Sequence, residues 1–587
     1  MVTAGRNTLN GFSNSRSGRR MWLQACMTFA AVAITIVASP ALAREKPRLI
    51  LQVTVDQLRG DMPTRYYDRL GEGGLRYLID EGIYYDDAHH DHANTETIVG
   101  HVTLATGANP AAHGMVGNLW FDRADGRVVY NIEDPGYRLL TDGAGVDAET
   151  EIDPTQKAAK TDGRSPRAIL TSTFSDELAS LTGGHAKIFG VSVKDRGAVS
   201  LAGHAGKAFW FSKADGQFVT STYYYDKYPK WVSDWNAKDP TKQYAGKAWE
   251  LMNPIGTYLF GDRDDQEWET DLAGYGKTFP HQFTTPDKRF FTTYLTISPA
   301  GDELTADFAK TLIAAEGLGD DEITDYLAVS FSSTDYVGHF FGPSSLESED
   351  NLLRLDRTLA DLFAFVDKEV GLANTLIVLS ADHGAPEAPG YLASLGMPTG
   401  YVSPDTWDKE PAIARVKKRF KITGKLVEAY SHPYVYLASD LLNNPRIDLA
   451  ELEAAVPEEL VAFPDVAYAI PSTSIEQGTA PENALIRAVR NNHNPSRSGN
   501  IYVVFRSGRF INEMDGLAAA VTHGSPWRYD TYVPVIFAGY GIEAQTVKRR
   551  IHTVDVALTL SNVVGALPPS GAAGNVLFEV LERRGSK

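Results

Sequence analysis

Six aspartate and histidine side chains flank apolar runs of the sequence, at positions where they could share metal ions. They are Asp56, Asp335, His339, Asp382, His383 and His523. Carboxylate and imidazole ligands without a thiolate suit Zn²⁺, Mn²⁺ or iron. Because six protein ligands are more than one tetrahedral zinc needs, this set predicts two metal ions.

The combination of these residues is more informative than any one of them. An isolated aspartate after a strand, such as Asp56, usually caps a turn or a helix, and the spacing of Asp335 and His339 alone can arise by chance. Asp382 and His383 are adjacent, so both can turn toward one ion at the end of a strand. The joint pattern therefore favours a shared metal site.

A hydroxyl group and three potential oxyanion-binding side chains accompany the expected metal ligands. Thr97 lies before a predicted helix, whose free N–H groups attract anions, although Thr97 could also be only its N-cap. Asn118 follows 21 residues later, and Lys194 and Arg196 follow the apolar run 188–193. Two cations at a strand end suit oxyanion recognition, with a surface salt-bridge pair as the alternative.

The elements that must position these residues are short apolar strands alternating with helices. The predicted strands are 49–55, 188–193, 326–332, 376–380, 501–505 and 533–538. The predicted helices are 97–105, 166–182, 304–316, 346–370 and 552–563. This alternation is typical of an α/β fold with a largely parallel sheet, in which ligands bind beyond the carboxyl ends of the strands.

Two segments are expected to be inserted into the α/β core. Residues 205–303 are rich in aromatic side chains, which we expect to form a small core of their own; the alternative is an aromatic wall over the active site. Residues 388–480 are rich in Pro, Gly and Glu and carry no chemical motif. The core is therefore expected in three parts, 44–204, 304–387 and 481–587.

Residues 1–43 are expected to be a cleavable export signal. Residues 1–20 contain four arginines and no acid, residues 26–38 form an apolar run, and residues 41–43 fit a small-x-small cleavage site. The run is too short to span a bilayer comfortably. We therefore expect a periplasmic or secreted protein without a membrane span, cut after Ala43, exported by either the general secretory or the twin-arginine route.

The composition excludes several classes of protein. Of 587 residues, 43% are hydrophobic, which excludes a disordered or fibrous chain. The net charge of −18 argues against a nucleic-acid partner but permits one phosphate in a pocket. The single cysteine, Cys26, excludes a disulfide within the chain and a thiolate metal site. Three neighbouring histidines, His89, His90 and His92, are expected in a solvated loop.

Together these residues resemble the alkaline phosphatase superfamily. Within it they resemble the bacterial phosphate-irrepressible alkaline phosphatases with a threonine nucleophile, which are related to the nucleotide pyrophosphatase/phosphodiesterases. The resemblance rests on Asp56, Thr97 before Gly100-His101, Asn118, Lys194 and Arg196, Asp335 four residues before His339, Asp382-His383-Gly384 and His523-Gly524. It extends from about residue 47 to about residue 565 and implies an α/β/α sandwich with inserted cap segments.

The resemblance also implies a role for each residue. One zinc ion would be held by Asp335, His339 and His523. The other would be held by Asp56, Thr97, Asp382 and His383. Thr97 would be the nucleophile that forms a phosphothreonine, and the non-bridging phosphate oxygens would be held by Asn118, Lys194 and Arg196. The implied protein is a monomeric two-zinc alkaline phosphatase with broad specificity for phosphate monoesters.

Three alternatives are open at this stage. A phosphodiesterase of the same superfamily would share the metal residues, but the cations Lys194 and Arg196 favour a monoester. A sulfatase needs a Cys or Ser in a C/S-x-P-x-R motif, which the sequence lacks. A secreted binding protein could use the same aspartates and histidines for a structural metal, with Thr97 only as a helix cap.

Overall fold

The computed structural model describes residues 46–403, 411–511, 513–514 and 517–582. The predicted export signal, 1–43, lies outside the described residues. Within them, no helix combines the length and apolar character needed to cross a membrane.

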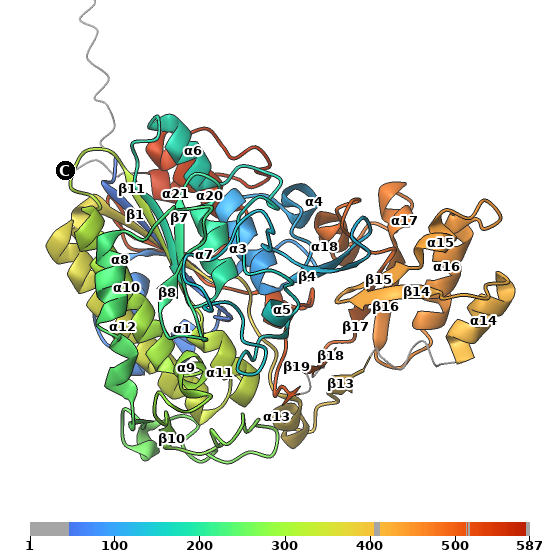
Figure 1. Ribbon diagram of the computed structural model, residues 1–587, viewed down its shortest axis with the longest axis horizontal. Helices are drawn as coiled ribbons and strands as arrows, with labels where there is room; N and C mark the ends of the chain where they lie inside the picture. Colours follow the sequence, from blue (N-terminus) through green and yellow to red (C-terminus); the bar gives the residue numbers. More distant parts are fainter. Residues whose placement is uncertain (1–45, 404–410, 512, 515–516, 583–587) are drawn as a thin grey trace, which may run out of the picture. The chain divides into compact units, whose positions relative to one another are not determined.

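A nine-stranded mixed sheet forms the centre of the described chain (Figure 1). Its strands lie in the order β22 (Gln545–Val547), β2 (Ile83–Tyr85), β21 (Val535–Gly539), β12 (Thr375–Ser380), β1 (Leu49–Val55), β11 (Asp325–Phe331), β6 (Ile188–Ser192), β7 (Lys207–Phe211) and β8 (Phe218–Val219). The strands from β12 to β7 are parallel, whereas β21 is antiparallel to both of its neighbours and β8 is antiparallel to β7. The α/β fold with a largely parallel sheet is therefore confirmed.

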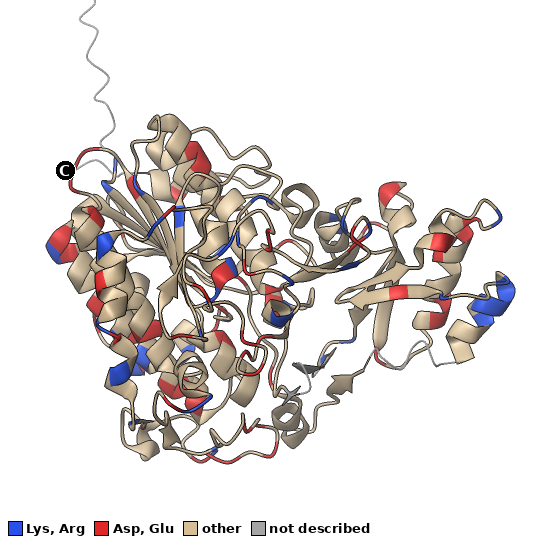
Figure 2. Cartoon of the chain, in the orientation of Figure 1, with Lys and Arg blue, Asp and Glu red and all other residues tan. Residues whose placement is uncertain are grey.

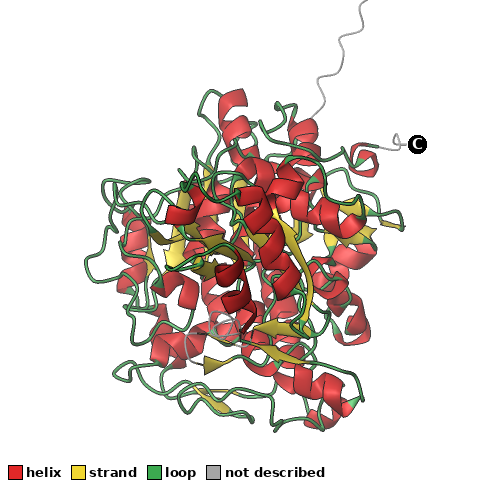
Figure 3. Cartoon of the chain, turned by 90° about the vertical axis from the view of Figure 1, so that its right-hand side faces the viewer, coloured by secondary structure: helices red, strands yellow, loops and turns green. Residues whose placement is uncertain are grey.

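Both faces of this sheet are buried, which explains why its strands are apolar without alternation. Successive strand residues point to opposite faces. Leu51 of β1 shares one apolar core with α10 (Pro299–Glu316) and α12 (Leu346–Glu369). Ile50 shares the opposite core with three helices: α3 (Thr97–Thr106), α6 (Phe174–Leu181) and α20 (Asp555–Val564). Figures 1 and 3 show helices on both sides of the strands.

The predicted helices are present with changed ends. The ranges 97–105 and 346–370 agree closely with α3 and α12. The range 166–182 was too long, because α6 begins only after Thr173, whose side chain accepts a hydrogen bond from the backbone N–H of Asp176 in a capping box.

A second, four-stranded antiparallel sheet combines three strands of the second inserted region with one strand that follows it in the chain. Its order is β14 (Val427–Ser431), β15 (Tyr434–Leu437), β17 (Ile501–Phe505) and β16 (Val466–Pro471). It packs with α14 (Pro411–Arg419) and α16 (Leu449–Leu460); the basic last turn of α14 is the blue group at one end in Figure 2. The expectation that 501–505 belongs to the central sheet is wrong. That run is buried on both faces, and an apolar run does not reveal which sheet it joins.

The first inserted region is less separate than expected. Its first two strands, β7 and β8, belong to the central sheet, so the sheet continues beyond the predicted boundary at 205. Phe209 and Phe218 pack against Phe308 of α10, with ring centroids 5.4 and 4.2 Å apart respectively. Most of the aromatic side chains thus extend the core that contains α10 and α12, whereas Trp210 and Tyr224 belong to another core cluster, and none of the region lines the cavity.

Two buried carboxyl groups, Glu269 and Glu347, lie where the first inserted region packs on α12. Their side chains are 5% and 0% exposed. Burial raises the pKa of both, and the charge of Glu347 raises the pKa of Glu269 further. His281 Nε2 lies 3.3 Å from Glu347 Oε1, but burial lowers the pKa of His281 to about 4, so it supplies no compensating charge at neutral pH.

We predict that Glu347→Gln increases the free energy of unfolding, and more at pH 9 than at pH 6. Folded Glu347 keeps its proton, whereas the unfolded carboxyl ionises above its ordinary pKa. The unfolded state therefore binds fewer protons, and stability falls as pH rises, by up to about 1.4 kcal/mol per pH unit. Urea unfolding at both pH values measures the gain, with exposed Glu322→Gln as the control. A loss of stability at pH 9 would show that Glu347 is needed as a carboxylate.

Candidate metal centre and anion-binding site

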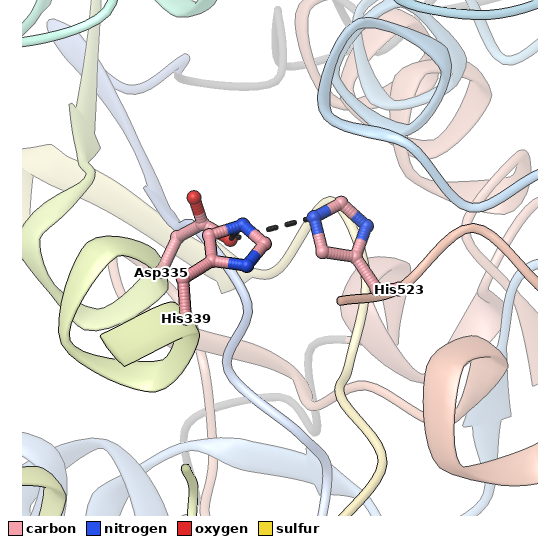
Figure 4. A group of neighbouring side chains, drawn as sticks. All are labelled: Asp335, His339 and His523. Atoms are coloured by element: carbon pink, nitrogen blue, oxygen red, sulfur yellow. Dashed lines mark ion pairs between the residues drawn. The ribbon is translucent and has the colours of Figure 1, made fainter. Parts of the chain in front are cut away.

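Asp335, His339 and His523 lie together beyond the carboxyl end of β11. Asp335 and His339 are one turn apart on α11 (Ser333–Phe341), so both side chains leave the same face of the helix. His339 Nε2 lies 3.1 Å and His523 Nε2 3.5 Å from Asp335 Oδ1. Figure 4 shows the two α11 side chains facing His523, which comes from a different segment. These ligand atoms are close enough to hold one cation.

Backbone carbonyls fix the orientation of all three histidines predicted to bind metal. The Nδ1–H of His339 donates to Val521 O at 2.7 Å, that of His383 to Gly384 O at 2.9 Å, and that of His523 to Thr95 O at 2.9 Å. Nε2 is therefore the ring nitrogen that faces the carboxylates in each case, and each Nε2 lies near an aspartate. Metal-ligating histidines are commonly held in this way.

A second group adjoins the first through Asp335. Asp56, Asp335 and His383 offer ligand atoms within 4.8 Å of one another. His383 Nε2 lies 3.3 Å from Asp56 Oδ1 and 3.4 Å from Asp382 Oδ2. Asp56 is fully buried, and its oxygens face Lys194 Nζ, 2.7 Å from Oδ2, and His383 Nε2. Buried carboxylates are stabilised by nearby cations, and these side chains form two adjoining groups of candidate metal ligands.

Two aspartates of this centre are held in their ionised form by neighbouring positive charges. Burial alone would raise the pKa of Asp335, but the charges of His339 and Lys194 hold it well below its usual range. Asp382 is likewise kept ionised, mainly by His383. Burial opposes protonation of His383, yet the carboxylates of Asp382 and Asp56 raise its pKa to about 9. The carboxylates thus favour bound positive charge.

The expected anion-binding residues border the same cavity. Thr97 is the first residue of α3, and its hydroxyl lies 3.3 Å from Arg196 Nη2. The backbone N–H of Ile98 donates to Asn118 Oδ1 at 3.0 Å, which leaves the amide nitrogen of Asn118 free for the cavity. Thr97, Asn118 and Arg196 all line this cavity, of about 490 Å³, together with Asp335, His339 and His523.

Lys194 is placed differently from Arg196. It precedes α7 (Asp195–Ala202), and its Nζ lies 2.7 Å from Asp56 Oδ2 and also contacts Asp335. Lys194 is 1% exposed, and its Nζ lies over the ring of Tyr336, 4.8 Å from the ring centroid. Burial lowers the pKa of Lys194, but Asp335 and Asp56 raise it overall, so the cation persists behind the carboxylates.

Two residues to which the sequence assigned no role, Gln57 and His101, hold the carboxylates of the expected metal set. Gln57 donates from its side chain to Asp335 Oδ1 at 2.7 Å and from its backbone to Asp382 Oδ1 at 3.1 Å. Its positive φ of 69° is unusual outside glycine. His101 Nδ1 lies 3.1 Å from Asp382 Oδ2, while its Nε2 lies 2.8 Å from Ser330 Oγ. The His101 signal, four residues after Thr97, was visible in the sequence.

Two acidic residues hold the anion-binding groups and were also missed. Arg196 Nη1 donates to Asp153 Oδ2 at 2.6 Å, and both side chains are buried. Breaking such a buried pair costs about 3–5 kcal/mol, so Asp153 fixes the guanidinium firmly. Glu96 Oε2 accepts the backbone N–H of Asn118 at 2.7 Å. Neither acid lies at the end of a predicted strand, so neither has the sequence signal that marks Asp56 and Asp382.

The expectation of a solvated loop at His89, His90 and His92 is wrong. These side chains are 6%, 4% and 0% exposed. His90 Nε2 donates to the carbonyl of Ala381 at 3.1 Å, next to Asp382. The histidines therefore pack behind the end of β12, where hydrogen bonds offset the cost of burying their polar atoms.

Two glycines allow the close packing around this centre. A Cβ on Gly338 of α11 would lie 1.8 Å from Gln57 Oε1, and one on Gly100 of α3 would lie 1.9 Å from the carbonyl oxygen of Asp382. Both distances are far below van der Waals contact. A larger residue at position 100 would push α3 away from the backbone of Asp382, and one at position 338 would displace the Gln57 amide from Asp335.

A family model and known relatives match this chain over most of its length. The model described as type I phosphodiesterase / nucleotide pyrophosphatase matches residues 50–526. The alkaline phosphatase PafA of Elizabethkingia meningoseptica is 36% identical over 543 residues, covering 92% of this chain and 95% of the relative. The alkaline phosphatase PhoV of Synechococcus elongatus is 33% identical over 542 residues, covering 92% and 93% of the two chains.

A solved structure supports the same relationship. The crystal structure of wild-type alkaline phosphatase PafA superposes with a TM-score of 0.80 at 35% identity. The match covers 92% of this chain and 99% of the other.

We predict that each metal group binds one ion. His339→Ala should remove about one equivalent of zinc per chain and His383→Ala the other, because each histidine belongs to only one of the two groups. Metal content after dialysis against zinc-free buffer measures this. His204→Ala, which removes a partly exposed histidine paired with Asp176, is the control and should keep both equivalents. Unchanged zinc content in both site variants would contradict the assignment.

Proposed function

The chain belongs to the type I phosphodiesterase/nucleotide pyrophosphatase family of the alkaline phosphatase superfamily, and from this premise we propose that it is an exported alkaline phosphatase. Its substrates would be phosphate monoesters, and its product inorganic phosphate. The names of the curated relatives support this class of reaction. The single observation that carries the proposal is the position of the Thr97 hydroxyl, 3.3 Å from Arg196 and in one cavity with Asp335, His339 and His523.

The residues fit a pair of zinc ions. The three histidines present Nε2 atoms, and the aspartates supply oxygen ligands, among them the fully buried Asp56. We assign Asp335, His339 and His523 to one ion. We assign Asp56, Thr97, Asp382 and His383 to the other. When bound, the ions would supply Lewis-acid charge that eases loss of a hydroxyl proton and stabilises a departing oxygen.

The chain's own residues would carry the substrate through two displacements. Thr97 Oγ, after losing its proton to solvent, attacks phosphorus in line, and the bond from phosphorus to the alcohol oxygen breaks. Water then attacks the phosphothreonine, which releases phosphate and restores the hydroxyl. Arg196 and the Asn118 amide hold the non-bridging oxygens, and the free N–H groups at the start of α3 add positive potential.

Charge and geometry favour a monoester over a diester. A monoester dianion has three non-bridging oxygens and a diester has two. Asn118, Arg196 and Lys194 can serve three oxygens, and Asp153 holds Arg196 in place. Lys194 lies against Asp56 and Asp335, so we propose that it reaches the phosphate once cations balance these carboxylates. A phosphodiesterase is the second candidate, since the matching family model is described by that activity.

Export and oligomeric state belong to the same proposal. The signal features of residues 1–43 support a periplasmic or secreted enzyme, cut after Ala43. A monomer remains our expectation.

We predict that Lys194→Ala/Arg196→Ala shifts the preference of the enzyme from monoester toward diester. Each charge-assisted bond to a buried oxyanion is worth about 1.5–3 kcal/mol, or about one to two decades of rate. The double variant should therefore lose several decades of kcat/KM on p-nitrophenyl phosphate and much less on bis-p-nitrophenyl phosphate, whose esterified oxygen cannot use one cation.

The control for this experiment is Arg138→Ala, an exposed arginine. It should leave both rates unchanged. Zinc content and thermal unfolding of the double variant separate lost recognition from a damaged site. Equal losses of kcat/KM on both esters would favour the phosphodiesterase over the phosphatase.

A further inference from the structure

The cavity at the reaction centre is larger than a phosphate group requires. Its volume of about 490 Å³ lies in the range of sites that enclose whole small molecules. One side carries Thr97, Arg196 and the expected metal ligands. The other side is mainly apolar and is lined by Leu119, Val128, Tyr430, Tyr502, Val504 and Phe505. We call these six residues the apolar wall.

Two hydrogen bonds join the segment that follows Tyr430 of the apolar wall to the segments that carry Asn118 and His523. Ser431 Oγ, at the end of β14, donates to the carbonyl of Leu119 at 3.0 Å, one residue after Asn118. His432 Nε2 donates to the carbonyl of Gly524 at 3.0 Å, one residue after His523. The second sheet therefore stands directly beside the groups that would hold phosphate and metal.

Tyr502 is the member of the wall with an unused polar group. Its side chain is 3% exposed, and its hydroxyl has no hydrogen-bond partner. The other tyrosine hydroxyls around the cavity are engaged: that of Tyr430 donates to His432 Nδ1, that of Tyr529 accepts from Gly508 N, and that of Tyr336 contacts Lys213. A buried hydroxyl without a partner is costly, and a ligand atom that enters between the residues of the wall can pair with it.

The position and protonation of Tyr502 suit a fixed hydrogen-bond donor. It lies on β17, an inner strand of the second sheet, and the ring of Tyr434 meets its ring edge-on at 5.1 Å. Burial raises its pKa well above the usual value, so the hydroxyl keeps its proton at alkaline pH. A rigid ring with a retained proton can select a ligand by both shape and hydrogen bonding.

We propose that the apolar wall is a leaving-group subsite for a neutral aromatic alcohol that carries a hydrogen-bond acceptor, with Tyr502 as the donor to that acceptor. The inference rests on the proposed phosphatase function and names its preferred substrates as aryl phosphate monoesters. The carboxylate of Glu96 also lines the cavity and would repel an anionic leaving group. Arg509, the cation at that side, is already paired with Asp465 at 3.4 Å.

Kinetics of Tyr502→Phe and Tyr502→Ala test the subsite. The substrates are ethyl phosphate, phenyl phosphate and the ortho, meta and para isomers of acetylphenyl phosphate, whose carbonyl is the acceptor. Tyr502→Phe should lower kcat/KM about tenfold for at least one acetylphenyl isomer and leave phenyl phosphate nearly unchanged, because only the hydroxyl is lost. Tyr502→Ala should lower kcat/KM about tenfold more for phenyl phosphate than for ethyl phosphate, because the ring contact is lost.

Two controls keep the result specific. The inhibition constant of inorganic phosphate, which reaches only the phosphate site, should stay within about twofold of wild type in both variants. Tyr468→Phe changes a half-exposed tyrosine on the neighbouring strand β16 and should alter no substrate preference. Tyr502→Phe keeps the ring, so it remains a valid test if Tyr502→Ala does not fold.

The outcomes separate the subsite from the proposed function. A wild-type protein that hydrolyses none of these esters would overturn both. Active variants that lose no acetylphenyl isomer selectively, and that lose phenyl and ethyl phosphate equally, would overturn the subsite alone.

Discussion

The repulsion among buried carboxylates is the constraint around which the rest of the site is arranged. Asp56, Asp335 and Asp382 follow adjacent strands, and the parallel register brings those strand ends together: Val55 lies opposite Phe331, and Thr54 opposite Ser380. The same register that satisfies the backbone of the sheet thus gathers negative charge in a low-dielectric interior. Such an arrangement is stable only with cations. Lys194 supplies one positive charge, and the histidines and aspartates form candidate groups of metal ligands.

The surrounding structure keeps these groups oriented. Carbonyl groups from three segments hold the histidine rings, while Gln57 and His101 hold Asp335 and Asp382. Among the expected anion-binding residues, Arg196 is held by a hydrogen bond to Asp153, and Asn118 is held by a hydrogen bond from its backbone to Glu96. Charges fixed by hydrogen bonds need not reorganise when a substrate arrives, which is the condition for efficient electrostatic catalysis. The second sheet closes the cavity without contributing any residue of the expected metal set.

The sequence was sufficient to predict the aspartate and histidine side chains at the strand ends. It was insufficient to predict the side chains that hold them in place. Asp56 and the Asp382–His383 pair follow runs whose apolar character reveals a buried strand. Gln57 and Asp153 have no such marker, because their roles depend on contacts with residues far away in the chain. The strand at 501–505 was recognised but placed in the wrong sheet, since burial on both faces is common to both sheets. The cluster of His89, His90 and His92 was misjudged because polar residues can be buried when the fold supplies partners.

The central claim is that Thr97 acts as the nucleophile beside a pair of metal ions. The most direct test strips the purified protein with a chelator, then titrates zinc while following p-nitrophenyl phosphate hydrolysis in wild type and Thr97→Ala. Wild-type activity should vanish on chelation and return as two equivalents are bound. Thr97→Ala should bind the same two equivalents yet lose about three or more decades of kcat/KM. Full activity in the stripped protein, or in Thr97→Ala, would contradict the account.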